Sequence, residues 1–204
     1  MQYLVWVNAP QYTTVDRYLR NVGVGVQESF RLFGEFQPLR MSMADFQQAI
    51  PTVLQHEGGY CNDPHDSGGK TNFGICKRSY PQLDIASLTP GDAQAIYHRD
   101  FWIPLQLDQV NSQAVATKVL DTAVLVGKSR AVKFLQRAVL NTGGGVVEVD
   151  GQIGPKTIAA ANQSSAVLLL ENYRQQLATY YGELVEAVPT NQKFLNGWLK
   201  RANS

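Results

Sequence analysis

Apolar residues recur every three or four positions through most of this chain. One apolar stripe runs from Val115 to Ala123, and a second runs from Val132 to Val139. This period matches one face of an α-helix. Gly127 separates the two stripes, so the pattern predicts two consecutive helices with a break at that glycine.

Capping and turn residues divide the rest of the chain into further helices. Ser42 and Asp45 fit a capping box for a helix that ends at Glu57, where two glycines follow. Pro51 lies inside that segment and should kink the helix or force a restart. The same kinds of signal predict helices that begin at Thr89 with Pro90, near Pro155, and over residues 165–187 and 191–202.

The remaining segments are a long N-terminal stretch and a turn-rich loop. Residues 1–42 place apolar side chains at roughly helical spacing, which predicts an accessory helix or an upstream extension. Short β structure, and no more, is expected around residues 71–75. The predicted fold class is therefore mainly α: a helical bundle around a long central helix, with a small irregular or β lobe.

Composition and charge narrow the class of protein. With 204 residues, 44% of them hydrophobic and a net charge of +1, the chain suits one globular domain, with or without a small appendage. A net charge this close to zero gives no indication of a positively charged surface that binds nucleic acid. No apolar run approaches the ~20 residues of a membrane span. The first residues lack the basic and apolar regions of a Sec signal, so a substrate outside the cytoplasm would require another delivery route.

The cysteines and histidines point to no metal site. The cysteines, Cys61 and Cys76, are too few for a disulfide scaffold or a four-cysteine zinc site. They flank the same loop, so one disulfide stays open as an alternative, but the absence of an export signal favours two free thiols. His56, His65 and His98 lack the tight spacing of zinc ligands, and we expect no metal or other cofactor.

Carboxylates concentrate in residues 57–71, EGGYCNDPHDSGGKT, where a predicted helix runs into a glycine-rich loop. Glu57 lies at the predicted C-terminal end of that helix, where the helix dipole carries about half a negative charge. This field opposes ionisation and should raise the pKa of the Glu57 carboxyl, as partial burial would. A general acid that works near neutral pH needs such a shift. The alternative is an exposed glutamate that frays the end of the helix.

Asp63 and Asp66 follow Glu57 in the same loop. A tight loop can return either of them opposite Glu57, so that two carboxylates face a gap. Glycoside hydrolysis requires such a pair: one protonated acid for the leaving oxygen, and one carboxylate for water or for the positive charge that develops on the sugar. Asp63 precedes Pro64, which favours a turn-forming role, whereas Asp66 stays open as the second carboxylate.

The 19 residues EGGYCNDPHDSGGKTNFGI resemble the signature of the glycoside hydrolase family 108 N-acetylmuramidases, which occur in phage endolysins and among bacterial secretion-associated muramidases. They also resemble the wider phage-lysozyme pattern of a glutamate, an aspartate about nine residues later, and a threonine. The resemblance implies a lysozyme-like α+β fold, with Glu57 as the catalytic acid, Asp66 as the second carboxylate and Thr71 as the residue that positions water or the sugar. The candidate substrate-binding residues in and near this motif are Tyr60, Asn62, Asp63, Asn72, Tyr97 and Trp102.

Later segments extend the resemblance to residues 43–202. IYHRDFWIPLQLDQV and RAVKFLQRAVLNTGGGVVEVDGQIGPKTIAA resemble the family's C-terminal region, which is described as peptidoglycan-binding, and YYGELVEAVPTNQKFLNGWLKRA resembles its closing helices. Some positions depart from the pattern. Leu125, in DTAVLVG, stands where relatives usually carry asparagine, and Cys61 and Cys76 replace small polar residues.

These features predict an N-terminal extension (1–42), a catalytic muramidase region (43–110) and a C-terminal helical region (111–204) packed with it as one unit. The predicted activity is hydrolysis of the β-1,4 bond between N-acetylmuramic acid and N-acetylglucosamine in the glycan strands of the cell wall. Two alternatives stay open. A lytic transglycosylase would cleave the same bond with one acid/base and no water, and a non-catalytic wall-binding module would assist secretion. The stereochemistry and the oligomeric state are not predicted.

Overall fold

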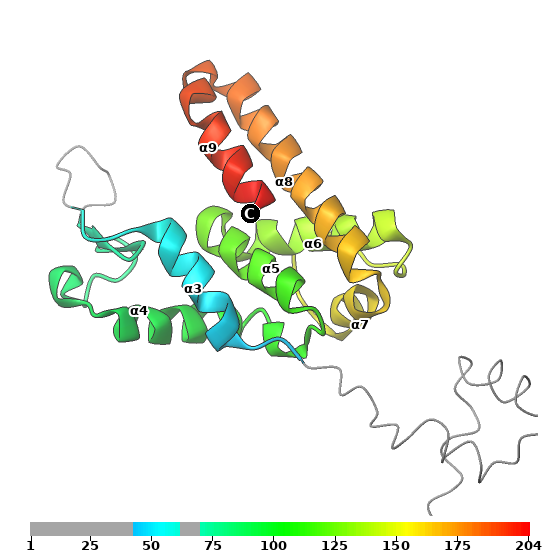
Figure 1. The fold of residues 1–204 in the computed structure, drawn as a ribbon, viewed down its shortest axis with the longest axis horizontal. Coiled ribbons are helices and arrows are strands. Elements are labelled where there is room, and N and C mark those ends of the chain that lie inside the picture. Colours follow the sequence, from blue (N-terminus) through cyan, green and yellow to red (C-terminus); the bar gives the residue numbers. More distant parts are fainter. Residues whose placement is uncertain (1–42, 62–69) are drawn as a thin grey trace, which may run out of the picture. The chain divides into compact units, whose positions relative to one another are not determined.

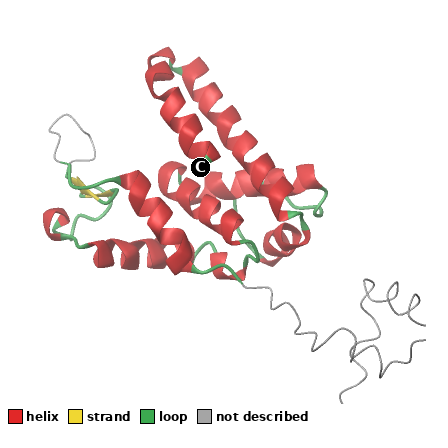
Figure 2. Ribbon diagram, viewed as in Figure 1, coloured by secondary structure: helices red, strands yellow, loops and turns green. Residues whose placement is uncertain are grey.

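The computed structural model describes residues 43–61 and 70–204, and Ser42–Ser204 form one compact unit. This unit is mainly α, as predicted (Figure 1 and Figure 2). The accessory helix predicted within residues 1–42 lies outside the described residues, as do Asn62, Asp63 and Asp66. None of the described helices is both long and apolar enough to cross a membrane.

Helix α3 (Phe46–Glu57) leads into the acidic loop. Its N-cap is Asp45, whose carboxylate accepts a hydrogen bond of 2.8 Å from the Gln47 amide, so the capping box predicted from Ser42 is corrected. The helix also continues through Pro51, where a kink or restart was expected. Pro51 and Gln47 are both exposed, so water is available to the carbonyl that loses its donor.

The predicted β structure is a short antiparallel hairpin. Strands β1 (Thr71–Asn72) and β2 (Ile75–Cys76) pair, and Cys61 adds a bridge on the other side of Thr71. The two turn residues, Phe73 and Gly74, both have positive φ angles, of 51° and 75°. This combination is that of a two-residue hairpin turn whose twist matches the strands.

Three short elements and one helix follow the hairpin. They are the 3₁₀ turn η1 (Ile85–Ser87), α4 (Pro90–Tyr97), the π turn η2 (His98–Trp102) and the 3₁₀ turn η3 (Leu107–Gln109). The start of α4 is as predicted: Thr89 caps the helix, Asp92 completes a capping box, and Pro90 takes the first turn.

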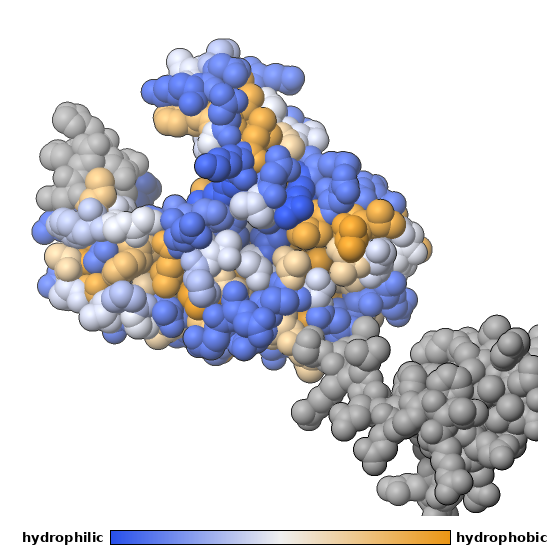
Figure 3. Space-filling view, in the orientation of Figure 1, coloured by the Kyte–Doolittle hydropathy of each residue, from blue (hydrophilic) through white to orange (hydrophobic). Residues whose placement is uncertain are grey.

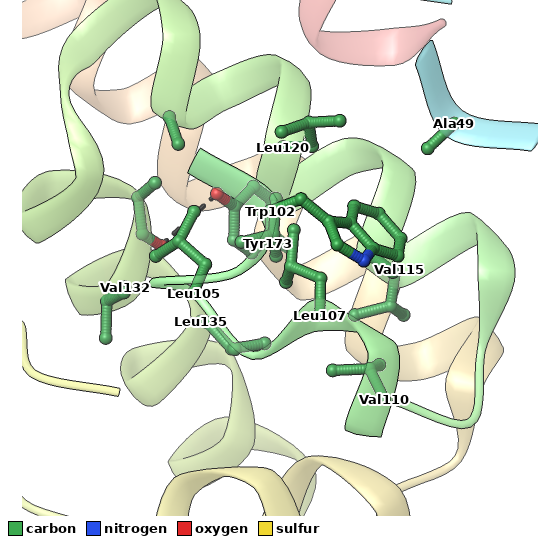
Figure 4. Close-up of a cluster of buried hydrophobic side chains, with 14 of the residues drawn as sticks. Ala49, Trp102, Leu105, Leu107, Val110, Val115, Leu120, Val132, Leu135 and Tyr173 are labelled. Atoms are coloured by element: carbon green, nitrogen blue, oxygen red, sulfur yellow. Dashed lines mark hydrogen bonds between the residues drawn. The ribbon is translucent and has the colours of Figure 1, made fainter. Parts of the chain in front are cut away.

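The core is built around α5 (Gln113–Val126), which contacts α3, α6 (Lys128–Thr142) and α8 (Ala166–Ala187). Gly127 separates α5 from α6 with φ 88°, as the two stripes predicted. Figure 4 shows side chains of α5, α6 and α8 meeting the segment from Trp102 to Val110. Tyr173 donates a buried hydrogen bond of 3.2 Å to the Ala131 carbonyl there.

The last helices complete the unit. Helix α7 (Pro155–Gln163) begins at Pro155, as expected, and α8 is followed by η4 (Pro189–Asn191) and α9 (Gln192–Asn203). Helices α8 and α9 run side by side as a hairpin (Figure 1), which returns the end of the chain to the level of α3 and α5. This return brings distant residues to the end of α3.

Candidate active site

Glu57 is the last residue of α3, and Gly58 ends the helix with φ 72°. The Glu57 side chain is 16% exposed, and its Oε1 accepts a hydrogen bond of 2.6 Å from Nη2 of Arg201 on α9. An ion pair this short and this shielded orients the carboxylate firmly.

The hairpin turn lies directly against Glu57. A Cβ atom built on Gly74 would come within 2.5 Å of Glu57 Oε2 and 2.6 Å of the Tyr97 hydroxyl oxygen. Position 74 therefore requires glycine for two reasons: its φ of 75°, and the space that the carboxylate and the phenol occupy.

Tyr97 lies beneath the turn and offers no face to a sugar. It is 2% exposed, and its hydroxyl donates a hydrogen bond of 2.7 Å to the Phe73 carbonyl. Burial, and secondarily the negative charge of Glu57, raise the pKa of the Tyr97 phenol. The structure therefore corrects the assignment of Tyr97 to substrate binding: it holds the turn against Glu57.

Arg201 is fixed by a second carboxylate. Its Nη2 and Nε donate to Oδ1 of Asp121, on α5, at 2.9 and 3.2 Å, and Nδ1 of His56 lies 2.8 Å from the same oxygen. Asp121 is 1% exposed. Burial alone would lower the pKa of Arg201, but the hydrogen bonds and charges of Asp121 and Glu57 outweigh it and raise that pKa. Arg201 is therefore a permanent cation that links α3, α5 and α9.

Sequence reasoning missed Arg201 and Asp121. Arg201 lies 144 positions from Glu57, and no spacing rule connects residues so far apart. Asp121 opens the DTAVLVG segment, whose departure from the family pattern is at Leu125. The sequence spacing of His56 bears only on zinc binding and does not indicate its contact with Asp121. The one available signal was a pair of ionisable residues, Lys118 and Asp121, inside an otherwise apolar stripe.

Two further predicted substrate-binding residues are structural. Asn72 is 5% exposed, and its Nδ2 donates to the carbonyls of Ile85 and Leu88 at 3.2 and 3.3 Å, which anchors the η1 segment to β1. Trp102 is 3% exposed and packs edge-on against Phe46, with ring centroids 5.5 Å apart. Neither side chain presents a surface to a ligand, so both assignments are corrected.

Tyr60 and Thr71 stay available to a substrate. Tyr60 follows the glycine pair and is 48% exposed. Thr71 is half-buried in β1, where its main chain makes two hydrogen bonds with that of Cys61, of 2.8 and 2.9 Å. It lies on the strand that leads into the turn against Glu57, so its predicted role stays a prediction.

Both cysteines are free thiols, and they lie on opposite sides of Thr71. Burial raises the pKa of the Cys76 thiol, but a hydrogen bond with Ser79 and nearby main-chain amides outweigh it and leave that pKa lowered. Among residues 43–61 and 70–204, no three histidine, cysteine or acidic side chains are grouped so as to hold a metal ion.

Comparisons with known proteins identify relatives of both halves of the chain. Residues 50–127 match the family model Glycosyl hydrolase 108, and residues 130–203 match the model Predicted Peptidoglycan domain. The chain is similar to the solved structure of SagA from Brucella abortus, at 30% identity and a TM-score of 0.63, over 78% of this chain and 89% of that one. No protein with a curated description matches. By these matches, the chain belongs to the glycosyl hydrolase 108 family.

Proposed function

We propose that this protein is an N-acetylmuramidase that hydrolyses the β-1,4 bond between N-acetylmuramic acid and N-acetylglucosamine, with Glu57 as the general acid. Membership of a glycoside hydrolase family supports the reaction type, and the Predicted Peptidoglycan domain supports peptidoglycan as the substrate. The choice of bond and of acid rests on the sequence motif and on the surroundings of Glu57.

The observation that carries the proposal is the fixed position of the Glu57 carboxylate. Arg201 binds one of its oxygens at 2.6 Å, and the other lies against Gly74 in the hairpin turn. A structural carboxylate at a helix end does not require a glycine turn to be packed onto it. A proton donor does require such restraint, because proton transfer depends on its distance from the leaving oxygen.

The chemistry proposed for Glu57 is transfer of its proton to the glycosidic oxygen as the bond to C1 breaks. The oxygen leaves as the hydroxyl of the departing sugar, and Glu57 becomes a carboxylate. Arg201 stabilises that carboxylate and so makes the transfer more favourable.

Asp66 and Thr71 complete the proposed reaction. A water oxygen bonds to C1, and its proton passes to a carboxylate. We assign the second carboxylate, which stabilises the positive charge on the sugar or accepts that proton, to Asp66. Thr71, beside the turn, orients the water or the sugar, and Tyr60 supplies an exposed ring at the edge of the site.

The C-terminal region is part of this proposal. Residues 111–204 supply Arg201, which bonds to Glu57 in the predicted catalytic region 43–110, and Asp121, which bonds to Arg201. We therefore propose that the two regions work as one unit on the glycan strand. The proposed place of action is the cell wall.

Product analysis tests the proposal. Purified peptidoglycan is digested with the wild type, with Glu57→Gln and with Glu148→Gln, which removes a carboxylate from an exposed loop position. Mass spectrometry of the wild-type digest should show fragments with reducing N-acetylmuramic acid ends. Glu57→Gln should lower their release by about 10²–10⁴-fold, the usual contribution of general acid catalysis. Glu148→Gln should match the wild type.

Each alternative predicts a different result. Ends carrying a 1,6-anhydro ring would identify a lytic transglycosylase, and binding to the wall without any product would identify a non-catalytic module. Wild-type rates from a folded Glu57→Gln protein would remove Glu57 from the mechanism.

A further inference from the structure

Two aromatic side chains are exposed among residues 43–61 and 70–204. They are Tyr60 and Phe194, each 48% exposed. Tyr60 follows the end of α3, and the proposed reaction already uses it. Phe194 belongs to α9 and lies outside the cluster of apolar side chains that forms the core. The Phe194 ring therefore presents a large apolar surface to solvent on the same helix that supplies Arg201.

The Phe194 ring is held by a stack of aromatic side chains. It is stacked on the Trp198 ring, with centroids 5.8 Å apart and 29° between the planes. Trp198 is stacked in turn on Tyr181 of α8, at 5.3 Å. Tyr181 is 2% exposed, so the stack begins in the core and ends in solvent at Phe194. A ring restrained in this way loses little conformational freedom when a ligand binds to it.

Phe194 and Arg201 share one face of α9. They are seven positions apart (201 − 194 = 7), which is close to two helical turns and about 10 Å along the helix. Gly197 lies on the same face between them. Apart from its chain neighbours, nothing lies within 4 Å of a Cβ atom built on Gly197. The helix is therefore uncovered at that point, and the face ends where Arg201 contacts Glu57.

This face of α9 belongs to one wall of a hollow in the molecular surface. Figure 3 shows the surface hollowed between the α8–α9 hairpin and the lobe that carries the β1–β2 hairpin and α4. Glu57 is contacted from both walls, by Arg201 of α9 and by the turn at Gly74. A long ligand that passes Glu57 and continues along α9 therefore meets Phe194.

We propose that this face of α9 is a distal binding site for the glycan strand, in which one sugar ring stacks on Phe194. This inference rests on the proposed function and adds a second point of attachment, more than one sugar unit from the bond that Glu57 breaks. A pyranose ring has an apolar face of C–H groups, which matches a flat aromatic ring. The occupant is the glycan because the face continues into the candidate active site through Arg201.

Lys193 lies beside the Phe194 ring, with its Nζ 4.8 Å from the ring centroid. Its side chain is exposed and flexible, so a sugar that stacks on the ring displaces the ammonium group. The displaced group stays within reach of the sugar hydroxyls and can donate hydrogen bonds to them. The cation therefore does not block the proposed platform.

Calorimetric titration of full-length Glu57→Gln tests the distal site without hydrolysis. The probe is a glycan octasaccharide of alternating N-acetylglucosamine and N-acetylmuramic acid, which is long enough to reach from Glu57 to Phe194. Adding Phe194→Ala to Glu57→Gln should weaken its binding by about fivefold, the loss expected for one aromatic contact. Adding Leu168→Ala, which removes an exposed apolar side chain near the start of α8, should not change it.

Hydrolysis gives a second readout, in proteins that keep Glu57. Phe194→Ala should raise the KM for the octasaccharide by about fivefold and leave kcat unchanged, because a distal contact is the same in the ground state and in the transition state. Phe194→Trp keeps a flat ring and should match the wild type. Phe194→Leu keeps an apolar side chain without a ring and should match Phe194→Ala; it also covers the case in which Phe194→Ala does not fold.

The distal site and the proposed function can fail separately. If the wild type releases no fragments while Glu57→Gln binds the octasaccharide through Phe194, the hydrolysis is wrong and the distal site is supported. If the wild type cleaves the octasaccharide, but Phe194→Ala and Phe194→Leu bind and cleave it equally well, the distal site alone is wrong. A Glu57→Gln protein that does not bind the octasaccharide would also overturn the distal site.

Discussion

At the scale of single residues, the site depends on one guanidinium group. Arg201 bonds to Glu57 and to the buried Asp121: its Nη2 donates to both carboxylates, and its Nε donates to Asp121 as well. A lysine could carry the charge but could not make both sets of hydrogen bonds in one geometry. The geometry of these hydrogen bonds indicates that Arg201 positions the Glu57 carboxylate as well as balancing its charge.

Replacing Arg201 with alanine should lower kcat/KM by about 100-fold, because the Glu57 carboxylate would lose its fixed orientation. Arg201→Lys should retain intermediate activity, and added guanidinium ion should partly restore Arg201→Ala. The free energy of unfolding should also fall by about 3 kcal/mol, since Asp121 would stay buried without its cation. Steady-state kinetics and urea unfolding measure the two effects. An Arg201→Ala protein with wild-type activity would exclude the positioning role.

Lys118 makes stability depend on pH in a defined direction. Burial lowers its pKa to about 8 in the folded protein, from 10.5 in the unfolded chain. Between these values the unfolded chain holds a proton that the folded protein has lost, so the free energy of unfolding rises with pH.

We expect the wild type to gain stability relative to Lys118→Met between pH 8 and 10, by at most about 3 kcal/mol, with a flat difference below pH 7. Urea unfolding of both proteins at several pH values measures this gain. Lys156→Met, the same charge change at an exposed position of α7, serves as the reference variant. A constant difference between wild type and Lys118→Met across this range would show that Lys118 titrates normally.

At the scale of elements, the hairpin β1–β2 acts as one wall of the site. Its turn is held from below by the Tyr97 hydroxyl of α4 and meets the last residue of α3. Helix α3, helix α4 and the β1–β2 hairpin therefore meet at Glu57, and the position of each limits the positions of the other two. The closest approach is at Gly74 in the turn.

Gly74→Ala and Gly143→Ala form a pair that isolates the close approach. Both glycines have positive φ, of 75° and 69°, so both alanines should incur a cost of about 1–2 kcal/mol in stability. Only at Gly74 would the new Cβ atom also meet Glu57 and Tyr97, at 2.5 and 2.6 Å, whereas nothing lies within 4 Å at Gly143. Gly74→Ala should therefore be the less stable variant and should lose most of the activity. Equal losses in the two variants would show that the turn can move away from Glu57.

At the scale of the whole molecule, the regions matched by the two family models share one core, and both contribute to the surroundings of Glu57. Helix α5 belongs to the part that matches Glycosyl hydrolase 108, yet it packs on α6 and α8 of the part that matches the Predicted Peptidoglycan domain. The match boundary falls at the Gly127 break, which is a turn within this core.

A fragment that ends at Gly127 should not fold. It would expose the buried stripe of α5 and would lack Arg201. Circular dichroism measures whether the fragment folds, and hydrolysis of cell walls measures its activity. Full-length Arg201→Ala is the control, because it lacks the Arg201 side chain but keeps the C-terminal helices. A folded, active fragment would show that the C-terminal region is an independent binding domain.

Local rules in the sequence determined most of the elements. The spacing of apolar residues predicted α5 and α6, Thr89 and Pro90 predicted the start of α4, and the glycines after Glu57 predicted the end of α3. These signals work because caps and helical periodicity act over a few residues. The predicted N-cap of α3 was wrong, since Asp45 and not Ser42 caps the helix, and the helix continues through Pro51 without a restart.

The sequence by itself also determined the family signature and the candidate acid, since residues 57–75 are contiguous. Only the tertiary structure decided what surrounds that acid. It placed Arg201 on Glu57 and Asp121 on Arg201, and it moved Tyr97 and Trp102 from candidate sugar platforms into the interior. The physical reason is that burial and ion pairing depend on how α9 folds back onto α3 and α5, and no local pattern records a contact across 144 positions.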